Sequence, residues 1–85
     1  MNKQEVFVAI KRNILEVLPG LDEGRVVPEA SMRDLGANSI DRADILIMTM
    51  ESLRLKFPLA ELGSLKNLQG LVDFLHGKLL AQNGA

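Results

Sequence analysis

The chain has 85 residues, of which 47% are hydrophobic, and a formal net charge of −1 at pH 7. A chain of this length forms one domain with a modest core, so a deep catalytic cleft is not expected. It has no cysteine and only one histidine, which excludes disulfides, thiolate nucleophiles and zinc sites built from these residues. Balanced charge, the absence of tyrosine and tryptophan, and the lack of a long apolar run argue against nucleic-acid and membrane partners. We therefore expect a cytoplasmic monomer.

The first predicted helix covers residues 3–18. Apolar side chains recur there at helical spacing on one stripe, which consists of Val6, Ile10, Ile14 and Val17, flanked by Phe7 and Leu18. The helix is expected to end at Pro19 and Gly20, because proline cannot continue the backbone hydrogen-bond ladder.

Residues 19–38 show no sustained periodicity, and a connection of this length is typical of a functional loop or of one that contains short structure. The S-x-x-D pattern from Ser31 to Asp34 predicts a single helical turn. We expect the apolar side chains of the loop to attach it to the core; they are Leu21, Val26, Val27, Met32 and Leu35.

The second helix is predicted over residues 39–54, which contain neither proline nor glycine. Its pattern has two apolar stripes. One is a core face made of Ile45, Leu46, Thr49 and Leu53, and the other consists of Ile40, Ala43 and Ile47 at positions i, i+3 and i+7. A helix in so small a domain cannot easily bury both stripes, so one of them is expected to be left for a ligand or partner.

A short helix is predicted over residues 59–62, ending at Gly63, and the last helix is expected to begin at Ser64 or Asn67. Its core face is the most regular in the chain and consists of Leu68, Leu71, Val72, Leu75 and Leu79. Residues 1–2 and 81–85 are expected to fray. The predicted fold is all-α, a small bundle of three main helices plus one short helix, with a long loop after the first helix.

Two interpretations fit Ser39, the residue at which the second helix begins. Ser39 or Asn38 could cap the helix, since Asn38 and Asp41 have the spacing of a capping box. Alternatively, Ser39 could be a covalent anchor, because a phosphate ester there would meet the positive end of the helix dipole. A self-activated nucleophile is disfavoured, since no base and orienting partner accompany the serine.

The stretch DLGANSIDRADIL, residues 34–46, resembles the segment around the modified serine of acyl carrier proteins, whose usual form is D-L-G-x-D-S-L. The resemblance extends through KFPLAEL and LQGLVDFLHG and covers nearly the whole chain, so residues 1–85 resemble a single acyl-carrier domain. It implies a non-enzymatic carrier in which Ser39 bears 4′-phosphopantetheine. A phosphopantetheinyl transferase would add this arm from coenzyme A, and an acyl-loading enzyme would charge its thiol.

The same resemblance implies that the second helix recognises partner enzymes. The matching positions are Asp34, Asn38, Ile40, Asp41, Ala43, Asp44 and Ile47. Acidic positions would meet basic patches and set encounter rate and orientation. The alternatives are that the acids in the first turn only complement the helix dipole, and that Ile47 belongs to the core.

The chain departs from the usual pattern in that Asn38 replaces an aspartate and Arg42 adds a positive charge to the second helix. GANSIDRADI is similar to freestanding carriers of polyketide β-branching cassettes, which implies an acetyl cargo and a hydroxymethylglutaryl-synthase-like partner. The remaining alternatives are a fatty-acid carrier, a peptidyl or aminoacyl carrier, and a helical protein-interaction module without a prosthetic group.

Overall fold

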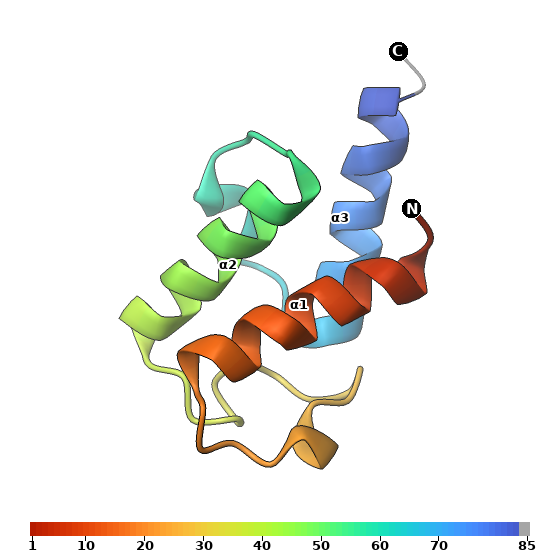
Figure 1. Ribbon diagram of the computed structural model, residues 1–85. Coiled ribbons are helices and arrows are strands. Elements are labelled where there is room, and N and C mark those ends of the chain that lie inside the picture. Colours follow the sequence, from red (N-terminus) through yellow and green to blue (C-terminus); the bar gives the residue numbers. More distant parts are fainter. Residues whose placement is uncertain (84–85) are drawn as a thin grey trace.

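The computed structural model describes residues 1–83 and is all-helical over that range, with no strand. Its three α-helices are α1 (Lys3–Val17), α2 (Ser39–Leu53) and α3 (Leu68–Asn83), and α1 packs against both of the others (Figure 1). Two 3₁₀ turns, η1 (Glu23–Arg25) and η2 (Leu59–Leu62), lie in the connections. The predicted fold class is therefore confirmed, and the predicted short helix is η2. The sequence pattern did not reveal η1.

The core lies between the three helices and consists of the apolar stripes that the periodicity marks. All five predicted core residues of α3 are buried, as are three of the four on the predicted stripe of α1. The side chains buried most completely are Val6, Ile10, Ile14, Ile45, Thr49, Leu68 and Leu75.

A polar contact crosses this core between α1 and α2. The Nδ2 of Asn13 donates to the Oγ1 of Thr49 over 3.0 Å, and Thr49 in turn donates to the carbonyl oxygen of Ile45 over 2.7 Å. Both side chains are buried. A buried amide must keep its partner, so this pair fixes the register of α1 against α2. The sequence alone does not show this contact, because it joins residues 36 positions apart, although Asn13 lies on the same face of α1 as Val6, Ile10 and Val17.

The long loop is attached to the core from Val26 onward, and the predicted anchor Leu21 is half-buried. Val26, Met32 and Leu35 are buried as predicted, but Val27 is 39% exposed, so the prediction that it anchors the loop is wrong. The backbone N–H groups of Leu68 and Gln69 donate to the carbonyl oxygens of Ala30 and Pro28 over 2.8 and 2.9 Å. The loop thus supplies acceptors that the first turn of α3 lacks.

The predicted helical turn within the loop is present. The Leu35 N–H donates to the Ser31 carbonyl oxygen over 3.1 Å, and the Asp34 N–H donates to the Ser31 hydroxyl oxygen over 3.0 Å.

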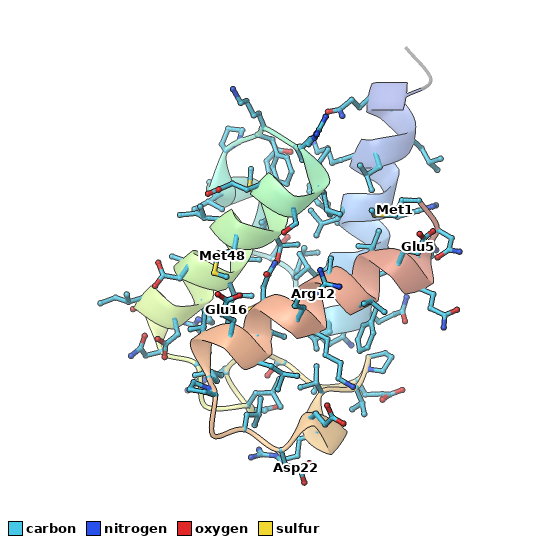
Figure 2. The ribbon with its side chains drawn as sticks, in the orientation of Figure 1. Met1, Glu5, Arg12, Glu16, Asp22 and Met48 are labelled. Atoms are coloured by element: carbon cyan, nitrogen blue, oxygen red, sulfur yellow. The ribbon has the colours of Figure 1, made fainter. Side chains whose placement is uncertain are left out.

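The chain ends are more regular than expected. Asn2 caps α1 in a capping box with Glu5, which Figure 2 shows at that end of the helix, and α3 continues to Asn83. Lys3 forms an ion pair of 3.0 Å with Asp73 of α3, and the hydrogen bond from Lys3 lowers the pKa of the Asp73 carboxyl group. The prediction that residues 1–2 and 81–85 fray also covers residues 84–85, which lie outside the described range.

α2 ends at a residue with strained backbone geometry. Arg54 has φ 56° and ψ 42°, in the left-handed region that glycine normally occupies at the end of a helix. A residue with a β-carbon is strained there.

Replacing Arg54 with glycine should therefore stabilise the fold by about 1 kcal/mol, because glycine adopts this conformation without steric cost. The measurement is the free energy of unfolding in urea. The control is Arg12→Gly at an exposed position inside α1, labelled in Figure 2, where glycine should cost a similar amount. Destabilisation by both variants would contradict the prediction.

Candidate functional site

The start of α2 is capped by Asn38 and not by Ser39. The Asp41 N–H donates to the Asn38 Oδ1 over 2.8 Å, and the Asn38 N–H donates to the Asp41 Oδ2 over 3.2 Å, which completes a capping box. The first helical residue is Ser39, which is exposed. The capping role that the sequence allowed for Ser39 or Asn38 therefore belongs to Asn38. The Ser39 hydroxyl takes no part in the cap.

The preceding turn places Ser39 at the surface. Gly36 has φ +97°, a conformation that disfavours any other residue, and the Ala37 N–H then donates to the Met32 carbonyl oxygen over 3.0 Å. Ala37 is buried, so the turn is pinned immediately before Asn38. The chain therefore enters α2 from a fixed point, and Ser39 stands at the end of a rigid helix.

Only one of the two apolar stripes of α2 is buried. Ile45 and Thr49 on the core stripe are 0% exposed, whereas Ile40 is 70% exposed and Ile47 is 43% exposed. Ala43, between them, is half-buried. The alternative that Ile47 belongs to the core is wrong, and the stripe of Ile40, Ala43 and Ile47 begins directly beside Ser39.

The acidic residues predicted for recognition lie in two different settings. Asp34 and Asp44 are exposed, so their carboxylates can meet a partner. Asp41 is half-buried and its carboxylate accepts the Asn38 N–H, so it takes part in the cap and lies in the first turn of α2. Arg25 donates to the Asp34 backbone carbonyl over 3.0 Å, which holds the loop that carries this acid.

A hollow that the sequence does not predict lies beside Ile47. Its volume is about 570 Å³, and Ile47 and Met50 of α2 line it together with Leu59 of η2 and Gln82 of α3. These residues come from three elements that only the fold brings together. The one sequence signal was the methionine, which is common on adaptable contact surfaces.

Two kinds of site, a metal centre and a membrane span, are absent from residues 1–83. Residues 1–83 contain no cluster of histidine, cysteine, aspartate or glutamate side chains that could hold a metal ion. No helix within this range is long and apolar enough to cross a membrane. An exposed hydroxyl at a helix start suits a phosphate ester, because the free amide groups and the helix dipole favour negative charge there.

Comparison with known proteins gives the family. The family described as "Phosphopantetheine attachment site" matches residues 9–75. The polyketide biosynthesis acyl-carrier-protein AcpK of Bacillus subtilis is 46% identical over 79 residues, covering 93% of this chain and 96% of that protein. Acyl carrier proteins of Guillardia theta and Thermosynechococcus vestitus are 34% and 33% identical, each over 95% of this chain and 100% of its own length. No solved structure matches significantly.

The family match covers well over half of the chain, and these relatives align along nearly all of it. Proteins of this family are carriers and not catalysts, and they work with phosphopantetheinyl transferases and acyl-processing enzymes. The chain therefore belongs to the acyl carrier protein family and carries a covalently attached 4′-phosphopantetheine.

Proposed function

We propose that Ser39 is the attachment residue and that the protein carries an acetyl group as a thioester, which it delivers to partner enzymes in polyketide β-branching. The observation that carries the proposal is the free, exposed Ser39 hydroxyl, since Asn38 supplies the helix cap. A hydroxyl that makes no hydrogen bond within the fold can be esterified without loss of the fold.

The other serines are less suitable for attachment. Ser31 is half-buried and its hydroxyl accepts the Asp34 N–H, while the Ser52 hydroxyl donates to the Met48 carbonyl oxygen over 2.8 Å. Ser64 is exposed but lies in the turn after η2 and does not begin a helix. Only Ser39 combines exposure with the positive end of a long helix dipole.

The prosthetic group supplies a thiol on which an acyl group can be held as a thioester. The protein supplies the attachment point for this arm and the surface that partner enzymes recognise. Tethering makes delivery to an active site partly intramolecular, so the effective acyl concentration rises without a new contact. That recognition surface is the stripe of Ile40, Ala43 and Ile47. The carboxylates of Asp34 and Asp44 steer the encounter with a partner enzyme.

The polyketide assignment rests on two observations. The carrier named for polyketide biosynthesis is 46% identical to this chain, while the two acyl carrier proteins above are 34% and 33% identical. In addition, GANSIDRADI resembles β-branching carriers and makes the start of α2 less acidic through Asn38 and Arg42. We propose a hydroxymethylglutaryl-synthase-like enzyme as the partner that draws on the acetyl cargo.

Treatment with coenzyme A and a promiscuous phosphopantetheinyl transferase should add the mass of one arm to the wild-type protein. Ser39→Ala should gain no mass, because the accepting oxygen is absent, and Ser64→Ala should be modified like the wild type. Intact-protein mass spectrometry gives the readout. Full modification of Ser39→Ala would show that another residue is the attachment site. An unmodified wild type would favour the helical interaction module.

Ile47→Asp should preserve the fold and slow acyl transfer to the partner about tenfold, because loss of a central apolar contact costs more than about 1 kcal/mol. Transfer rates of the acylated protein and circular dichroism are the measurements. Val72→Asp is the matched change at a buried site and should unfold the bundle, since an unpaired buried charge costs several kcal/mol. Unfolding of Ile47→Asp would place that residue in the core.

The acetyl-loaded protein, made with acetyl-coenzyme A and the transferase, should be consumed by the hydroxymethylglutaryl-synthase-like enzyme when a β-ketoacyl thioester is supplied, because the β-ketone of that thioester accepts the acetyl group. The same protein loaded with an eight-carbon acyl chain should be consumed at least tenfold more slowly. Mass spectrometry of the arm follows both reactions. Equal consumption of the two, or elongation of the longer chain by fatty-acid enzymes at a higher rate, would favour the fatty-acid carrier instead.

A further inference from the structure

The exposed stripe of α2 does not stop at Ile47. Met50 and Arg54 follow Ile47 at positions i+3 and i+7, so they continue the same face of the helix to its end. Ile47 and Met50 also line the hollow of about 570 Å³, and Leu55 and Leu59 contribute further apolar lining. The stripe therefore leads directly into a hollow that can receive an apolar side chain of a second protein.

The rim of this hollow has a net positive charge. Arg54 and Lys56 line it together with a single carboxylate, that of Glu51. Both cations are exposed, and neither takes part in an ion pair within residues 1–83. An apolar hollow with an excess of cations at its rim is complementary to an apolar side chain that has a carboxylate beside it.

The charge on this face changes sign along α2. The exposed carboxylate of Asp44 precedes Ile47 by one helical turn, whereas Arg54 lies at the far end of the helix, about 15 Å further along its axis. This separation exceeds the screening length of about 8 Å at physiological ionic strength, so a partner meets the two charges as separate points. A partner with a matching basic and acidic group can satisfy both in only one direction along α2.

The backbone at Arg54 also points to a contact role. Its φ of 56° places a residue with a β-carbon in a conformation that glycine would adopt without strain. No ion pair of the Arg54 side chain within residues 1–83 compensates for this strain. Strained residues concentrate at functional sites, where a side chain is required that stability alone would not select.

We propose that the hollow beside Ile47 receives an aliphatic or aromatic side chain of the acyl-processing partner enzyme, and that Arg54 and Lys56 pair with a carboxylate next to that side chain. This inference rests on the proposed function, because the partner is the enzyme that draws the acyl group from the arm at Ser39. The contact fixes the direction in which the enzyme lies along α2, so its active site faces the end that carries the arm.

The test measures acetyl transfer from the acetyl-loaded protein to the hydroxymethylglutaryl-synthase-like enzyme, with a β-ketoacyl thioester present, over a range of carrier concentrations. Arg54→Gln/Lys56→Gln should raise the KM for the carrier about tenfold and lower kcat much less, because two docking contacts are lost and the chemistry is not. Arg54→Lys keeps the charge and should stay within about threefold of the wild-type KM. About 0.5 M NaCl should raise the KM of the wild type more than that of the double variant.

Arg54→Gly separates the contact from the structural effect of this residue. It should raise the free energy of unfolding and yet raise the KM, because it removes both the strain and the guanidinium. Met50→Gln tests the apolar part of the contact. It replaces a half-buried lining side chain with a polar one of similar length, and it should raise the KM while circular dichroism stays unchanged.

The control is Arg12→Gln, which removes an exposed charge from α1 outside the hollow and should leave the KM unchanged. A wild-type KM in Arg54→Gln/Lys56→Gln, or in a folded Arg54→Gly, would overturn the inference. Because glycine relieves strain at position 54, Arg54→Gly decides the question even if the double variant unfolds. Failure of the wild-type protein to transfer acetyl to this enzyme would instead contradict the proposed function, so the two failures are distinguishable.

Discussion

The architecture depends on one constraint: α2 has two apolar stripes, and the bundle can bury only one. Ile45 and Thr49 are buried in the core, whereas Ile40 and Ile47 remain in contact with water. Exposed apolar area costs stability that a domain of this size can hardly spare. This stripe lies beside the Ser39 hydroxyl, so under the proposed function the contact surface and the attachment point lie on the same helix.

The long first loop holds that element in place. Its carbonyl groups at Pro28 and Ala30 accept hydrogen bonds from the first turn of α3, and its buried side chains reach the core from the other side. The loop therefore joins the start of α3 to the start of α2. Because Ala37 is buried and Gly36 permits the reversal, the chain arrives at Asn38 in a conformation suited to capping.

Much of this organisation could be predicted from the sequence, because amphipathic periodicity and capping residues are local signals. The three helices, the turn at Ser31, the short helix at residues 59–62 and the exposed stripe of α2 all follow from spacing. The family resemblance predicts attachment at Ser39, and the structure shows only that Asn38, and not Ser39, caps the helix.

What local signals could not give are contacts between distant segments. Val27 looks like a loop anchor but is exposed, because which side chain of a loop turns inward depends on the tertiary path. The Asn13–Thr49 pair and the hollow beside Ile47 join residues far apart in the chain. Their spacing carries no period that a sequence pattern would reveal.

The Asn13–Thr49 bond also limits how carriers of this kind can exchange parts. A chimera that receives a foreign α2 keeps the Asn13 amide, which was formed to meet a hydroxyl at position 49. If the foreign helix lacks both this hydroxyl and that of Ser52, whose oxygen lies 3.5 Å from the Asn13 Nδ2, a buried donor is left unpaired at a cost of about 1–3 kcal/mol. An exchanged α2 must therefore supply a hydroxyl that pairs with the Asn13 amide in the core. This requirement lies on the buried face of the helix, opposite the exposed face that an exchange would be designed to transfer.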